Sequence, residues 1–241
     1  MHSALYYWLP LFLLLGSWEF ALQNPQWLAY LFAACIVGSV LFVLPLLAGR
    51  QREQVDYVTS LSIIVFLSGI FWWLLWVDLG LVKYVIPILL VIVVAKFFNT
   101  EQRVTTQARL LTYIGGCFFW AHITFGLVAV LGWDPWHAAL IFLGAFVLLS
   151  GPLFLHEETH RRQYVLWAVF CLLVLEGFSV FVWLPFAEAT LALLLTLCAA
   201  ALFDFSKYMI DDALVTKKIV IKKILLYASA IAVLLVSTPW H

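Results

Sequence analysis

Two histidines one helical turn apart, His156 and His160, enclose two glutamates in the segment HEETH. The spacing fits the H-E-x-x-H pattern, in which both imidazoles lie on one face of a helix and bind zinc. Glu157 would then activate the metal-bound water. A catalytic zinc also needs a third protein ligand. Asp204 is the candidate, because the helical hairpin expected between the two segments returns the chain to the same membrane surface.

With this motif the chain resembles zinc-dependent intramembrane peptidases, whose H-E-x-x-H lies on a membrane helix and whose third ligand is an aspartate of a later helix. The resemblance implies zinc held by His156, His160 and Asp204. The segment LFDFSKY around Asp204 departs from the D-G pattern of that family.

A second resemblance overlaps the first, because Glu157, Glu158 and Arg162 fit the E-E-x-x-x-R signature of CAAX-prenyl-type intramembrane proteases. It implies catalytic glutamates at Glu157 and Glu158. That family also needs two downstream histidines, whereas the only histidine after His160 is His241. Each resemblance covers fewer than ten residues of this chain.

The alternative for HEETHRRQ is a hydrated cytoplasmic turn, whose charges end two membrane spans and orient the chain. A contact with lipid or with a partner protein is a third interpretation. We favour the turn, so we expect no catalytic residue, bound metal or cofactor, and keep zinc as the alternative.

Composition assigns the chain to the membrane proteins, since 66% of its 241 residues are hydrophobic and 11% are charged. Such a composition excludes a water-soluble surface. Apolar runs follow one another with short connections, so we expect residues 1–241 to form one integral membrane domain without a separate soluble domain. The formal net charge of zero gives no indication of nucleic-acid binding.

The apolar runs predict an all-α, polytopic transmembrane bundle of about nine spans, built from tandem helical hairpins. The segment Ser150-Gly151-Pro152 either kinks the sixth span or ends it and starts the next helix. The nine predicted spans are Ala4 to Leu22, Trp27 to Leu47, Tyr57 to Val77, Leu81 to Phe98, Leu110 to Leu131, Trp136 to Leu155, Tyr164 to Leu184, Ala187 to Phe205 and Ile224 to Pro239.

The connections alternate between short, base-poor segments and longer, charged ones. If the charged set faces the cytoplasm, 12 of the 13 Lys and Arg lie there, and Lys83 alone lies outside. This partition predicts a multi-pass protein of the cell membrane with a cytoplasmic N-terminus and an external C-terminus. Tryptophans near the predicted outer ends would form an interfacial belt: Trp18, Trp27, Trp76, Trp133, Trp136, Trp183 and Trp240.

Two ionisable residues, His122 and Glu176, lie well inside predicted spans. His122 follows Arg109 by thirteen positions and Glu176 follows Gln163 by thirteen, so both should lie about 20 Å along parallel helices. Burial of a charge in the membrane costs roughly 3 kcal/mol or more, and a His–Glu pair would lower that cost. We favour such a pair as a contact between helices; a proton or cation relay is the alternative.

Four lysines in the last charged connection surround an apolar Ile-Val-Ile segment: Lys217, Lys218, Lys222 and Lys223. Lysines at a membrane surface attract anionic lipid headgroups by up to about 1 kcal/mol each, so we expect headgroup contact here. The same residues would satisfy the positive-inside rule without a specific lipid.

These features favour a non-catalytic membrane scaffold or assembly partner, in contact with the lipid bilayer and with other membrane proteins. Two alternatives from other classes stay open. One is an intramembrane zinc metallopeptidase using HEETH, and the other is a small-solute or proton-coupled transporter using His122 and Glu176.

Overall fold

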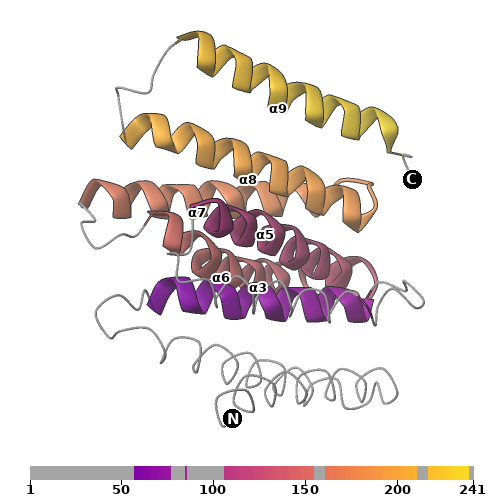
Figure 1. The fold of residues 1–241 in the computed structure, drawn as a ribbon. Coiled ribbons are helices and arrows are strands. Elements are labelled where there is room, and N and C mark those ends of the chain that lie inside the picture. Colours follow the sequence, from indigo (N-terminus) through magenta and orange to yellow (C-terminus); the bar gives the residue numbers. More distant parts are fainter. Residues whose placement is uncertain (1–56, 77–84, 86–105, 155–160, 211–216, 239–241) are drawn as a thin grey trace. The chain divides into compact units, whose positions relative to one another are not determined.

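The computed structural model describes residues 57–76, 85, 106–154, 161–210 and 217–238. Every regular element in these ranges is an α-helix (Figure 1). Contacts divide the chain into two compact units, Met1–Gly116 and Cys117–His241. The helices are α3 (Tyr57–Trp76), α5 (Thr106–Ala129), α6 (Pro135–Phe154), α7 (Arg161–Phe181), α8 (Glu188–Ile210) and α9 (Lys217–Ser237).

Five of these helices, α5 to α9, are long and apolar enough to cross a membrane. They correspond to the fifth to ninth predicted spans, so the described residues form an all-α structure with five candidate membrane spans. Helix α3 contains a shorter apolar stretch, Ser62–Leu74. The first, second and fourth predicted spans lie outside the described residues, and the part of the chain that is described does not support the count of about nine.

In the first unit, α3 has one buried face. Its largest buried side chains recur every three or four residues, which is the spacing of a single helical face. They are Ile63, Leu67, Ile70, Phe71 and Leu74.

In the second unit, α6 to α9 follow one another as antiparallel neighbours, each packed on the next. The turn before α6 shows how the local sequence ends one helix and starts another. Gly132 has a φ of 65°, a conformation that glycine adopts without strain, and Trp133 N–H donates to the Leu127 carbonyl at 3.1 Å. The Asp134 carboxylate accepts from Trp136 N–H at 2.8 Å, which makes Asp134 the N-cap with Pro135 as the first helical residue.

Pro152 lies inside α6, which continues to Phe154. The Ser150-Gly151-Pro152 segment therefore neither ends the sixth span nor begins the following helix. Proline leaves the carbonyl four residues earlier without its helical donor. Membrane helices tolerate this loss because neighbouring helices and hydroxyl side chains compensate for it. In α6 the carbonyl concerned is that of Leu148, and the nearby Ser150 hydroxyl donates to the Phe146 carbonyl at 2.7 Å.

A continuous series of phenylalanine rings fills the core of the second unit. Phe125 of α5 stacks on Phe178 of α7, with ring centroids 4.5 Å apart, and Phe178 stacks on Phe142 of α6 at 5.1 Å. The series continues through three helices with centroid separations of 5.1 to 5.7 Å, and its remaining members are Phe146, Phe170, Phe154 and Phe203. Aromatic rings in such offset and edge contacts bind α5 to α8 into one core.

The structure corrects the prediction for the last charged connection. Helix α8 extends to Ile210 and α9 begins at Lys217, so the four lysines lie in the first two turns of α9 and not in a loop. Lysine and isoleucine are compatible with a helix, and the hydrophobic run after Lys223 extends the same helix without a break.

Candidate functional site

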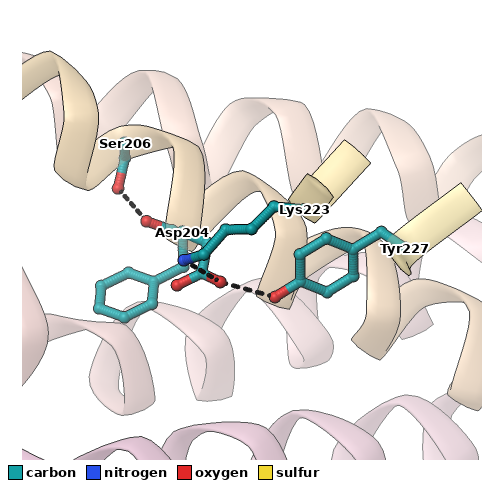
Figure 2. A network of polar contacts seen from close by, with 5 residues as sticks. Asp204, Ser206, Lys223 and Tyr227 are labelled. Atoms are coloured by element: carbon teal, nitrogen blue, oxygen red, sulfur yellow. Dashed lines mark hydrogen bonds and ion pairs between the residues drawn. The ribbon is translucent and has the colours of Figure 1, made fainter. Parts of the chain in front are cut away.

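Four polar side chains meet where the base-rich ends of α8 and α9 pack together, and we call Asp204, Tyr208, Lys223 and Tyr227 the polar cluster. Figure 2 shows three of them, Asp204, Lys223 and Tyr227. Asp204 Oδ2 receives hydrogen bonds from Lys223 Nζ and from the Tyr227 hydroxyl, each at 2.9 Å. Lys223 Nζ also lies 5.3 Å from the centre of the Tyr208 ring, which is cation–π distance.

Sequence spacing explains how the polar cluster forms. Asp204 and Tyr208 are four residues apart on α8, and Lys223 and Tyr227 are four residues apart on α9, so each pair shares one helical face. Asp204 lies six residues before the end of α8, and Lys223 lies six residues after the start of α9. The two therefore lie at the same level of an antiparallel hairpin.

The polar cluster holds α9 against α8. No residue of α9 between Ile219 and Ser237 is fully buried, but half-buried residues recur every three or four positions, at Val220, Tyr227, Ala230, Ile231, Leu234 and Leu235. At the opposite end of the hairpin, the hydroxyls of Thr190 and Thr238 lie 3.5 Å apart and both are buried. The side chains of Lys223 and Asp204 are 33% and 22% exposed, so their charges are partly shielded from solvent. Polar contacts at both ends of the hairpin thus add to the packing of this half-buried face.

The predicted zinc site has one residue in the described part of the chain. His156, Glu157, Glu158 and His160 lie outside it. Asp204 is described, and its Oδ2 atom is bound by Lys223 and Tyr227. The described residues contain no group of three His, Cys, Asp or Glu side chains that could hold a metal ion. Metal binding through Oδ2 would have to displace the lysine.

The predicted headgroup lysines have different surroundings. Lys222 is exposed on the first turns of α9, whereas Lys223 binds Asp204. The side chains of Lys217 and Lys218 lie outside the described residues. The structure thus brings together Asp204 and Lys223, two residues that the sequence assigned to different sites. Their equal offsets from the hairpin turn are the signal that could have predicted the pair.

His122 and Glu176 lie in different surroundings. His122 is 7% exposed on α5. Glu176 is exposed on α7. Nearby, Phe125 and Phe178 stack, so α5 and α7 meet just beyond both residues. No hydrogen bond or ion pair joins His122 to Glu176 in the described ranges, and their pairing stays a prediction.

Glu176 belongs to a stripe of exposed residues on α7 that we call the α7 outer face. The other members are apolar, and the stripe is Val165, Val169, Leu172, Leu173, Glu176 and Val180. The opposite face of α7 carries the buried core residues Phe170, Cys171, Val174 and Phe178. The outer face is thus an exposed, mainly apolar surface with one carboxylate.

A second polar contact that the sequence did not predict joins α6 to α7. Trp167 donates from Nε1 to Ser150 Oγ at 2.9 Å, and the Cys171 sulfur lies 4.0 Å from the same oxygen. This contact lies beside Pro152, where α6 lacks one backbone hydrogen bond.

Comparisons of the chain with protein-family models, curated proteins and solved structures gave no match.

Proposed function

We propose that this protein is a non-catalytic membrane scaffold or assembly partner that binds another membrane protein through the α7 outer face. The observation that carries the proposal is Glu176, a carboxylate exposed in an otherwise apolar stripe of a candidate membrane span.

The position of Glu176 makes contact with lipid alone unfavourable. The candidate span runs from Gln163 to Phe181, so Glu176 lies five residues, or about 7.5 Å along the helix, from its nearer end. An ionisable side chain within a membrane costs roughly 3 kcal/mol near the centre and less toward the interface, and such residues usually pair. Within the described residues, Glu176 makes no hydrogen bond or ion pair. A helix of another protein would supply the missing partner.

The other polar groups of the second unit support a structural role. Asp204 binds Lys223 and Tyr227, and Trp167 binds Ser150. Each contact joins two neighbouring helices, which is how polar side chains stabilise membrane bundles. A scaffold needs rigid helices of this kind and one surface whose polar group is left to bind a partner protein.

The proposed orientation follows the basic residues and extends to the whole chain. Lys222 is exposed at one end of the second unit, and the exposed Trp133, Trp136 and Trp183 lie at the ends of helices facing the other way. We place the lysine end at the cytoplasmic face of the cell membrane, in contact with anionic headgroups, with the N-terminus inside and the C-terminus outside. The multi-pass array of hairpins, with about nine spans, belongs to the same proposal.

Site-specific photo-cross-linking in native membranes tests the proposal. A photoreactive residue at Leu172 or Val180, on the α7 outer face, should give a discrete product heavier than one chain. The matched controls are Leu225 and Val233 of α9, which are 63% and 67% exposed on a helix with no outward carboxylate. Products confined to lipid adducts, internal cross-links, or the same pattern from both helices would contradict the proposal.

The two alternative classes have their own measurements. About one zinc per purified chain, lost in a His160→Ala variant, would favour the peptidase, because a structural or catalytic zinc binds stoichiometrically. Proton-coupled flux in liposomes, lost in a folded His122→Leu variant, would favour the transporter.

A further inference from the structure

We propose that Lys222 binds the phosphate of an anionic membrane lipid and that Asp204 keeps Lys223 from the same lipid. The inference rests on the membrane placement made under the proposed function. It deepens the headgroup contact placed there by naming the residue that binds the lipid and the residue that limits the binding. It does not depend on Glu176 or on a partner protein.

Lys222 and Lys223 are consecutive in the sequence but occupy different faces of α9. Successive residues of an α-helix are rotated by about 100° around its axis. Lys223 lies on the half-buried face, where its Nζ atom is 2.9 Å from Asp204 Oδ2 and 5.3 Å from the centre of the Tyr208 ring. Lys222 is exposed. One lysine is therefore held by α8, and the other lies on the surface of the hairpin.

The exposed face around Lys222 is apolar, which favours a lipid as the ligand over an acidic soluble molecule. Ile219 lies one turn before Lys222, Leu225 and Leu226 lie one turn after it, and all three are exposed. The candidate span begins at Ile219, so Lys222 lies about 4.5 Å inside it. A lysine near the end of a membrane helix keeps its aliphatic stem along the acyl chains and extends its ammonium group to the headgroups.

The direction of α9 brings the Lys222 side chain closer to the lipid phosphates. The candidate span of 19 residues is about 28 Å long, which is close to the roughly 30 Å thickness of the hydrocarbon layer. Ile219 therefore lies near the boundary between acyl chains and headgroups. Side chains of an α-helix lean toward its N-terminus, and the lysine end of α9 is its N-terminal end. The stem of Lys222 thus leans out of the apolar layer.

The net charge of the lipid decides which lipid Lys222 binds. The phosphate of phosphatidylcholine is balanced by a cation of the same headgroup, whereas an anionic lipid keeps a net negative charge. One lysine near the membrane surface raises the affinity for an anionic lipid by up to about fivefold. Lys223 and Asp204 form a pair without net charge, so this pair adds little to the attraction. Loss of the Asp204 charge would make Lys223 a second cation for the same lipid.

Quenching by brominated lipids tests the inference in the purified, full-length protein. A fluorescent non-canonical residue replaces Leu226, which lies one turn after Lys222 on the same face. The vesicles contain equal amounts of phosphatidylcholine and phosphatidylglycerol, and one of the two lipids is brominated. Stronger quenching by the brominated phosphatidylglycerol measures its enrichment beside the fluorescent residue. We expect about twofold enrichment or more at Leu226. A fluorescent residue at Val236, which is 86% exposed near the other end of α9, should report none.

Variants identify the charges that are responsible. Lys222→Gln, a change on the protein surface, should remove most of the enrichment at Leu226, and Lys222→Arg should keep it. Asp204→Asn should raise the enrichment by about twofold or more, because Lys223 loses its counter-charge. Asp204→Asn combined with Lys223→Gln should return the enrichment to the wild-type value. Glu188→Gln removes a carboxylate from the other end of α8 and is the matched control, with no expected change.

Three results would overturn the inference. The first is equal enrichment in the wild-type protein and in Lys222→Gln. The second is an enrichment that Asp204→Asn leaves unchanged, and the third is an equal gain from Glu188→Gln, which would indicate a general effect of net charge. None of these results affects the proposed scaffold, which the photo-cross-links from the α7 outer face test. Missing cross-links together with the expected enrichment would refute the scaffold and support the lipid site.

Discussion

Lys223 of α9 places its Nζ atom 2.9 Å from Oδ2 of Asp204 on α8, and this ion pair joins the two helices. Both side chains are partly exposed, at 33% and 22%. The pair therefore falls between exposed ion pairs, which contribute up to about 1 kcal/mol, and buried pairs, whose disruption costs about 3 to 5 kcal/mol. The ion pair adds a polar contact to the packing of α9, whose inner face is only half-buried.

Asp204→Asn should lower the free energy of unfolding by about 1 to 2 kcal/mol, because it leaves Lys223 without its counter-charge. Tyr227→Phe removes the second hydrogen bond to the same oxygen and should cost about 1 kcal/mol or less. Denaturant titration in detergent micelles measures both. An unfolding free energy unchanged by Asp204→Asn would show that the ion pair does not hold α9.

The Trp167–Ser150 hydrogen bond should couple α6 to α7. Trp167→Phe and Ser150→Ala should each destabilise the protein, and the double variant should cost less than the sum of the two. The expected coupling is about 0.6 kcal/mol, the average for hydrogen bonds between membrane helices. The same micelle titration gives the cycle. Additive single effects would place the stabilising role of Ser150 in its bond to the Phe146 carbonyl instead.

A double-mutant cycle tests whether the side chains of His122 and Glu176 interact. The pairing predicted from sequence requires that His122→Leu and Glu176→Leu together cost less than the sum of the single changes. Because Glu176 is exposed and His122 is buried, we expect the effects on the unfolding free energy of the isolated chain to add. Coupling of more than about 0.5 kcal/mol would support the pair predicted from the sequence and leave the α7 outer face without a free carboxylate.

Membrane orientation is testable with reporter fusions. Fusions after Arg52, Arg103, Arg162 and Lys218 should report the cytoplasm, and fusions at Asn24 and Asp134 should report the outside, because basic residues stay on the cytoplasmic side. Asp134 lies in the described turn between α5 and α6, which makes it the most informative position. Two or more reporters in the opposite compartment would overturn both the orientation and the span count.

The candidate spans of the second unit could be predicted because hydrophobicity over about 20 residues is a local property. The sixth predicted span, Trp136 to Leu155, differs from α6 by one residue at each end. The start of α9 was missed by seven residues, since charged Lys217 and Lys223 are compatible with a loop or with a helix that continues beyond the lipid.

Side-chain partners could not be predicted from spacing alone, because they depend on the rotation of each helix about its axis. Equal offsets suggested that His122 and Glu176 share a depth, but they carry no information on which face each residue occupies. Asp204 was assigned to zinc because its contact with Lys223 depends on how α8 and α9 pack. The outward position of Glu176 is likewise a property of the packed bundle.

The mass of the assembly extracted from native membranes tests the central claim most directly. In polymer nanodiscs, native mass spectrometry should find the 27.4 kDa chain in a complex with a different protein. A Glu176→Leu variant, which should fold because the changed side chain faces outward, should be found alone. Detection of the wild-type chain and the Glu176→Leu variant in the same state, whether both alone or both in the same complex, would contradict assembly through this carboxylate.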